Sequence, residues 1–228
     1  MRKKPYQEDG ITLRSWKKAQ VAQGGTGKRG VIQSPGCGKC RGELPWEHHI
    51  YFPPADHLSP VSGMRIGILS DTHDNLPMVA KAVARLNGLS PDLVLHAGDF
   101  VAPFVLPRLA GLPCPCIGVF GNNDGDRTLL TAKARETGNV EIHGCFTVRQ
   151  AGGRSIALVH GHEPEALDEI AGAGIFDVVV YGHTHRPSII ERNGTLLVNP
   201  GEVCGYLTGT GTVAVLETGQ LEAKILEL

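Results

Sequence analysis

The stretch RIGILSDTHDN, residues 65–75, joins a short apolar segment directly to a cluster of polar side chains. An apolar run of this length, bounded by polar residues, predicts a buried β-strand. The next residues, 76–87, carry apolar side chains at helical spacing, and a helix tolerates Pro77 in its first turn. The stretch therefore predicts a strand, a polar loop and a helix in direct succession.

This succession occurs three times in residues 65–136. Further strands are predicted at 92–97 and 116–120, and further helices at 102–110 and 126–136. Strand–helix units in series favour parallel strands joined by crossover helices. The N-terminal part of the fold is therefore expected to contain a parallel sheet.

The C-terminal half follows a different pattern. Residues 145–160, 188–200 and 211–228 each contain two apolar runs around a turn, which predicts three hairpins. A helix and a buried strand are expected between the first two hairpins, at 163–174 and 176–182. Parallel units followed by hairpins predict an α/β fold, a four-layer sandwich of two mixed β-sheets flanked by helices.

Residues 1–63 differ in character from the rest of the chain. They are rich in Gly and Pro and hold 10 Lys/Arg against 5 Asp/Glu, whereas residues 64–228 hold 12 against 18. We expect residues 1–63 to be a disordered extension, with an upstream mis-start as one explanation, and the folded domain to begin at Met64. Cys37 and Cys40, with two histidines nearby, offer zinc-type ligands, but a lone Cys-x-x-Cys favours incidental residues.

The composition argues against several classes of protein. With 41% hydrophobic and 20% charged residues, the chain is typical of a soluble globular protein. No segment approaches the ~20 apolar residues of a membrane span, and no secretory signal is recognisable, so a cytoplasmic location with reduced cysteines is expected. A formal net charge of -1 argues against nucleic acid as a partner.

Polar clusters follow five of the apolar runs: SDTHDN, HAGDF, FGNND, LVHGH and YGHTH. In open α/β sheets, ligands bind beyond the carboxyl ends of the strands, so these clusters are candidates for one shared site. A mixture of carboxylate, amide and imidazole donors suits Mn²⁺, Fe, Zn²⁺ or Ni²⁺ rather than Mg²⁺ or Ca²⁺ alone. The candidate donors are Asp71, His73, Asp99, Asn122, His160, His183 and His185.

The number and spacing of these donors favour two metal ions. Asp71 and His73 are two residues apart, which places them on the same side of an extended segment, and His183 and His185 have the same spacing. Seven donors exceed the needs of one tetrahedral site, and the carboxylate of Asp99 has two oxygens with which to bridge two cations. A single histidine at a strand end is more often structural, but five clusters in order favour a site.

Together, SDTHDN, HAGD, GNND, VHGH and GHTH resemble the motifs of the calcineurin-like metallophosphoesterases, and most closely those of the YfcE-type phosphodiesterases. The resemblance covers residues 64–228. It implies hydrolysis of small or generic phosphodiesters by two divalent cations, Mn²⁺ foremost, with a hydroxide between them. It also divides the donors: Asp71, His73, Asp99 and His185 would hold one cation, and Asp99, Asn122, His160 and His183 the other.

The resemblance assigns supporting roles as well. His162 would contact the phosphate or support a ligand, and Asp124 would orient its neighbours, while His96 and Asn75 are weaker candidates. Many members of the superfamily carry a histidine that protonates the leaving group where this chain has Asn123, so leaving groups that need no proton should react better.

The turn that reads NPGS in YfcE-type enzymes reads NPGE here, residues 199–202. Three alternatives stay open: a phosphomonoesterase, a protein phosphatase, and a non-catalytic scaffold like the retromer subunit Vps29. The complete donor set counts against the scaffold. A homo-oligomer is compatible with the sequence.

Overall fold

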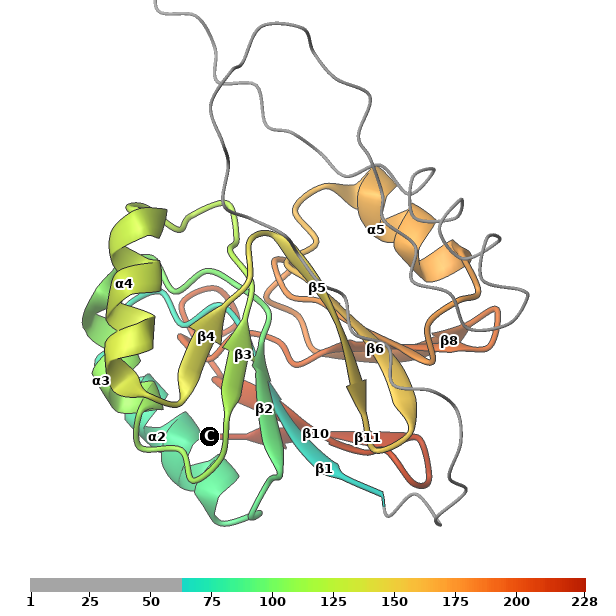
Figure 1. Cartoon of the computed structure of the whole chain (residues 1–228), viewed down its shortest axis with the longest axis horizontal. Helices are drawn as coiled ribbons and strands as arrows, with labels where there is room; N and C mark the ends of the chain where they lie inside the picture. Colours follow the sequence, from blue (N-terminus) through green and yellow to red (C-terminus); the bar gives the residue numbers. More distant parts are fainter. Residues whose placement is uncertain (1–62) are drawn as a thin grey trace, which may run out of the picture. The chain divides into compact units, whose positions relative to one another are not determined.

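The structure is a computed structural model that describes residues 63–228 (Figure 1). The predicted disordered extension and the Cys37/Cys40 pair lie outside the described residues. The described part begins just before the first strand, β1, Arg65–Leu69. None of its helices is both long and apolar enough to cross a membrane.

A six-stranded sheet is built on the three predicted strand–helix units. Its order is β11-β10-β1-β2-β3-β4, and β1 to β4 run parallel. The strands that join β1 are β2 Leu93–His96, β3 Cys116–Gly118, β4 Val140–Ile142, β10 Thr212–Glu217 and β11 Glu222–Glu227. The predicted parallel strands and the last hairpin are confirmed, whereas β4 was not predicted.

A five-stranded sheet contains the other two hairpins. Its order is β5-β6-β7-β9-β8, in which β6, β7 and β9 are parallel and the edge strands β5 and β8 are antiparallel to their neighbours. Its strands are β5 Phe146–Ala151, β6 Arg154–Val159, β7 Val178–Val180, β8 Ser188–Arg192 and β9 Thr195–Asn199.

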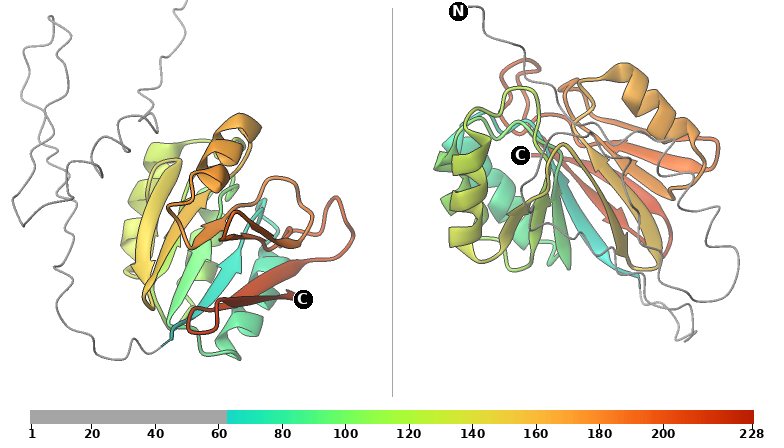
Figure 2. Two further views of the ribbon diagram at one scale, coloured as in Figure 1. Left: turned by 90° about the vertical axis from the view of Figure 1, so that its right-hand side faces the viewer. Right: turned by 45° about the horizontal axis from the view of Figure 1, so that its top comes forward.

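The helices flank the two sheets (Figure 1 and Figure 2). The helices α2 Leu76–Asn87, α3 Leu106–Leu109 and α4 Arg127–Thr137 cover the six-stranded sheet, and α5 Pro164–Gly172 lies beside the five-stranded sheet. The single helix predicted at 102–110 is instead a 3₁₀ turn, η1 Pro103–Val105, followed by α3. Pro107 has no N–H to donate to the carbonyl of Pro103, which removes one α-helical hydrogen bond and favours the break in this segment.

Alternation along β1 divides the core into two apolar layers. Ile66 and Ile68 are completely buried between the two sheets, together with residues such as Leu158 and Val180. Leu69 faces the opposite way and packs in the layer between the six-stranded sheet and its helices. Side chains on both faces of the strand are therefore buried, as a four-layer sandwich requires, and the predicted fold class is confirmed.

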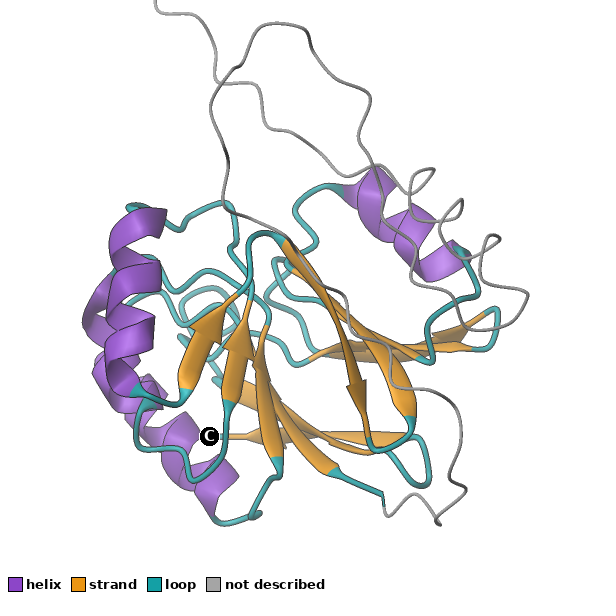
Figure 3. Ribbon diagram, in the orientation of Figure 1, coloured by secondary structure: helices purple, strands orange, loops and turns teal. Residues whose placement is uncertain are grey.

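The loops that follow the parallel strands of both sheets meet at one end of the molecule, where Figure 3 shows them in teal. Several hydrogen bonds connect the two sets of loops. The backbone N–H of His183 donates to Oδ2 of Asp71 at 3.1 Å, Nδ1 of His160 contacts the carbonyl of Ala97 at 2.7 Å, and the N–H of Val203 donates to the carbonyl of Ser70 at 3.0 Å. The expected shared site can therefore form between the sheets.

Candidate metal centre

The backbone of the site is folded back on itself rather than extended. Positive φ angles of 40° to 65° occur at five predicted donors: Asp71, His73, Asp99, His183 and His185. The expectation that the paired donors lie on extended segments was therefore wrong. Left-handed backbone costs a non-glycine residue roughly 1–2 kcal/mol, so the surrounding structure must impose it. The N–H groups of Asp71 and His73 donate to the carbonyls of Gly98 and Asp99 and hold this turn.

A first group of donors lies around Asp71. Its Oδ1 is 3.4 Å from Nε2 of His185 and 3.8 Å from Nε2 of His73, and the two histidine rings are stacked 5.1 Å apart. Oδ1 of Asp71 and Nε2 of His73 are buried and have no hydrogen-bond partner. The thiol of Cys204 lies within 4.8 Å of a ring nitrogen of each of these two histidines. Buried donor atoms that lack hydrogen-bond partners and lie within 3.8 Å of one another fit a bound cation.

A second group surrounds His160. Its Nε2 is 3.1 Å from Oδ1 of Asn122 and 3.3 Å from Oδ2 of Asp99, and its ring lies 5.2 Å from the ring of His183. Nδ1 of His160 donates to the carbonyl of Ala97, so in the neutral ring Nδ1 carries the proton and the lone pair of Nε2 faces the group. A metal-binding histidine is commonly oriented in this way.

Asp99 lies between the two groups. Its Oδ2 is 3.4 Å from Nε2 of His73 and 3.3 Å from Nε2 of His160, and its side chain is completely buried. Within residues 63–228, Asp99 and Asp71 form ion pairs only with histidines. Two buried carboxylates without Lys or Arg are suited to divalent cations.

The charged groups of the site shift one another's pKa values. Burial alone would raise the pKa of Asp99, but His160 and Asn123 outweigh it and lower the pKa well below its usual range. The Asp71 carboxylate raises the pKa of His73, against burial and with help from Asp99. Burial would lower the pKa of His160, yet Asp99 raises it. The carboxylates thus favour the positively charged form of the neighbouring imidazoles, as they would favour a bound cation.

Residues 64–220 match the model of the calcineurin-like phosphoesterase superfamily domain. The phosphodiesterase MJ0936 of Methanocaldococcus jannaschii is 38% identical over 165 residues, which cover 72% of this chain and 99% of that protein. The chain belongs to the calcineurin-like phosphoesterase superfamily. The family identified from the five motifs is confirmed, and with it a phosphoester hydrolase.

Solved structures agree with this assignment. A structure described as a novel archaeal phosphodiesterase shares 38% identity and a TM-score of 0.69, and the match covers 72% of this phosphoesterase and all of that chain. The phosphoesterase YfcE of E. coli, at 22% identity, shares the fold with a TM-score of 0.51, over 72% of this chain and 98% of that one.

The other two predicted site residues of this phosphoesterase, His162 and Asp124, lie in different surroundings. The ring of His162 lies 5.5 Å from that of His160, at the border of the second group. The carboxylate of Asp124 instead accepts three backbone N–H groups, from Gly121 and Val101 at 2.7 Å and from Asp99 at 3.2 Å. Asp124 therefore holds in place the loops after β2 and β3, which carry predicted metal donors.

The two weaker candidates lie outside both groups. His96 is completely buried and stacks on Phe100, with 3.7 Å between ring centroids. Asn75 accepts the N–H of Met78 as the N-cap of α2 and donates to the carbonyl of Cys204 at 2.8 Å. Both residues support the loops rather than face the donors.

The sequence prediction missed Glu202 as a member of the site. Its Oε2 lies 2.7 Å from Nδ1 of His185, on the side of the ring opposite Asp71. The motif NPGE was recognised as a departure from NPGS, but the partner of the glutamate lies 17 residues away in sequence. Only the change from Ser to Glu within the turn could have drawn attention to it.

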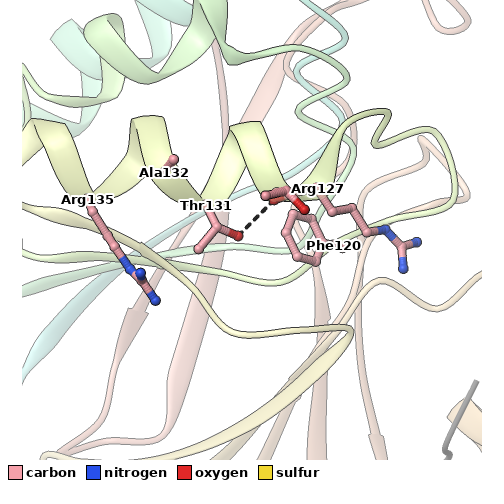
Figure 4. Close-up of a pocket in the computed structure, with 6 residues that line it drawn as sticks. Phe120, Arg127, Thr131, Ala132 and Arg135 are labelled. Atoms are coloured by element: carbon pink, nitrogen blue, oxygen red, sulfur yellow. Dashed lines mark hydrogen bonds between the residues drawn. The ribbon is translucent and has the colours of Figure 1, made fainter.

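A surface pocket of about 390 Å³ lies beside α4 and contains none of the seven predicted donors (Figure 4). The hydroxyl of Thr131 donates to the carbonyl of Arg127 at 2.8 Å within it. The guanidinium of Arg127 lies 5.2 Å from the centroid of the Phe120 ring. The pocket is lined by Phe120, Arg127, Thr128, Thr131, Ala132 and Arg135.

Proposed function

We propose that this phosphoesterase is a metal-dependent phosphodiesterase with a dinuclear centre bridged by Asp99. The observation that carries the proposal is the position of Asp99 Oδ2, within 3.4 Å of histidine nitrogens from both donor groups. The unpartnered atoms of Asp71 and His73 support it, because such atoms are costly to bury without a ligand. The first cation would bind Asp71, His73, Asp99 and His185, and the second would bind Asp99, Asn122, His160 and His183.

The chemistry follows from the donors. When bound, a pair of divalent cations would activate water near neutral pH and would neutralise the oxygens of the phosphoryl group. The chain contributes orientation: Ala97 fixes the ring of His160 and Glu202 fixes that of His185 through their Nδ1 atoms. His162 would contact a phosphate oxygen, and its ring position 5.5 Å from that of His160 supports this role. Mn²⁺ is the proposed metal because the family resemblance favours it, and the mixture of oxygen and imidazole donors suits it as well as Fe, Zn²⁺ or Ni²⁺.

The substrate class is proposed from similarity and from Asn123. The relative from M. jannaschii is named a phosphodiesterase, which favours diesters over monoesters. Asn123 occupies the position of the leaving-group acid and cannot protonate an alkoxide, so small diesters with good leaving groups fit best. A cytoplasmic location remains a prediction.

The test compares the wild type with Asp99→Ala for Mn²⁺ uptake and for hydrolysis of bis-p-nitrophenyl phosphate. We expect two Mn²⁺ per chain and hydrolysis in the wild type, and loss of Mn²⁺ with at least ~100-fold less activity in the variant. Asp168→Ala is the matched control, because Asp168 is an exposed carboxylate on α5 that pairs with Arg192.

Three results would contradict the proposal. Retained activity in Asp99→Ala would exclude the bridging role. A wild type that binds Mn²⁺ but hydrolyses neither diesters nor monoesters would favour the scaffold. Preference for p-nitrophenyl phosphate or a phosphopeptide would favour a monoesterase or a protein phosphatase.

A further inference from the structure

Glu202 is a buried carboxylate just beyond the predicted metal donors. It follows β9 in the turn 199–202, and its side chain has no exposed surface. Among the ion pairs of the described residues, its only partner is His185. A buried charge without Lys or Arg is costly unless hydrogen bonds replace the lost water.

Every polar neighbour of Glu202 is a hydrogen-bond donor. Oε1 accepts the N–H of Leu207 at 2.9 Å, and both the N–H and the hydroxyl of Thr208, at 2.6 and 2.7 Å. Oε2 accepts from Nδ1 of His185 at 2.7 Å, from the thiol of Cys204 at 3.0 Å and from the N–H of Tyr206 at 3.1 Å. Both oxygens therefore accept several hydrogen bonds, which suits the ionised form of the carboxylate.

This environment decides which nitrogen of His185 carries the proton. An ionised carboxylate only accepts hydrogen bonds, so the neutral ring must present Nδ1–H to Glu202. Nε2 is then left with a lone pair, and it lies 3.4 Å from Oδ1 of Asp71. The atom that faces the first donor group is therefore ready to bind a cation.

We propose that Glu202 is a positioning residue for the first donor group, which fixes the ring of His185 and, through three backbone N–H groups, the loop 203–210. The inference rests on the proposed metal centre. It adds that affinity for one cation of the pair, and not for the other, depends on Glu202.

Glu202→Gln tests this role because the variant keeps the shape of the side chain. It replaces a carboxylate, which only accepts hydrogen bonds, with an amide, whose NH₂ group donates them. In one orientation the amide NH₂ faces the N–H groups of Leu207 and Thr208. In the other orientation it faces Nδ1 of His185 and favours the tautomer with the proton on Nε2, which blocks metal binding. Thr208→Ala is the matched control, since it removes one donor to Oε1 and leaves the bond to His185 intact.

Mn²⁺ is titrated by calorimetry into the metal-free wild type and both variants. We expect Glu202→Gln to weaken one of two binding steps by about 10- to 100-fold, and Thr208→Ala to change neither step by more than about threefold. If Glu202→Gln leaves the Mn²⁺ affinity of both binding steps unchanged, the inference is overturned. Equal weakening of both steps would also overturn it, because Glu202 contacts only His185 among the seven predicted donors.

A second measurement needs no Glu202 variant and decides the case if Glu202→Gln fails to fold. Long-range ¹H–¹⁵N correlation spectra of the metal-free wild type in alkaline buffer report the tautomer of each histidine. We expect the Nδ1–H form at His185, whose signal is identified by its absence in His185→Gln. The Nε2–H form would contradict the inference.

These outcomes are distinct from failure of the proposed metal pair. Fewer than two Mn²⁺ in the wild type, or full Mn²⁺ uptake by Asp99→Ala, would contradict the dinuclear centre. The role of Glu202 is judged separately, from the Glu202→Gln titration and the tautomer of His185.

Discussion

Asn123 holds both carboxylate oxygens of Asp99: its backbone N–H donates to Oδ1 at 2.9 Å, and its side-chain amide donates to Oδ2 at 2.8 Å. Asn123, which stands where many members of the superfamily carry a histidine, thus orients the central carboxylate. The amide contributes to the low pKa of Asp99 and supplies no proton at neutral pH.

The first prediction concerns the leaving group. Without a general acid, whose contribution is typically 10²- to 10⁴-fold, we expect alkyl diesters to react at least ~100-fold more slowly than p-nitrophenyl diesters. The measurement is kcat/KM for a series of diesters plotted against the pKa of the leaving alcohol or phenol. Asn123→Ala should lower the rates and leave the slope unchanged. A flat plot for the wild type would show that another acid acts.

The second prediction concerns Asp124. Its carboxylate accepts three backbone N–H groups, so Asp124→Asn places an amide N–H against at least one donor. We expect the free energy of unfolding of the metal-free protein to fall by about 1–3 kcal/mol, measured by urea denaturation. Asp126→Asn is the control: Asp126 caps α4 through one N–H, and asparagine caps equally well. Equal effects of the two substitutions would contradict the prediction.

The third prediction concerns Gly121. A Cβ at this position would overlap Oδ1 of Asp99 and lie 2.9 Å from its Cγ, so Gly121→Ala must displace the central carboxylate. We expect activity on bis-p-nitrophenyl phosphate to fall ~100-fold, as misplacement by about 1 Å can cost this much. Gly172→Ala, at the end of α5 with nothing within 4 Å, should leave activity unchanged. Normal activity in Gly121→Ala would show that Asp99 tolerates the shift.

The fourth prediction concerns pH and His96. Burial lowers the pKa of His96 to about 3, whereas an unfolded histidine titrates near 6.5. The unfolded chain therefore takes up the proton first, so stability present above pH 6.5 is lost as the pH falls toward 3. The loss is at most roughly 1.4 kcal/mol per pH unit. The check is urea denaturation of the metal-free wild type and of His96→Gln between pH 7 and 4.5. The contributions of the other titrating groups cancel in the difference between the two free energies of unfolding. Parallel stability curves would contradict the prediction.

Much of the fold could be predicted because strong local signals coincide. The helix expected at 76–87 is α2 to the residue, since Asn75 caps it, and its apolar face is regular. The strand β4 could not be predicted: Val140–Ile142 has three residues, of which Glu141 is exposed, too few to show a period.

The candidate site was predictable in composition and less so in shape. Every predicted donor lies in one of the two groups, because each follows an apolar strand whose carboxyl end faces the same region. The backbone at His183 and His185 could not be foreseen, since left-handed angles arise from loop contacts rather than from the spacing of residues. Glu202 was missed for a related reason: its role depends on donors that only the folded loop assembles.

The donors come from both halves of the sandwich. Asp71, His73, Asp99 and Asn122 follow strands of the six-stranded sheet, and His160, His183 and His185 follow strands of the five-stranded sheet. A cation pair bound by donors from both sheets would connect the two sheets to each other. Cation occupancy and sheet-to-sheet cohesion would then be thermodynamically linked. Substitutions in the apolar layer between the two sheets, such as Val180→Ala, should weaken cation affinity, although Val180 itself binds no cation.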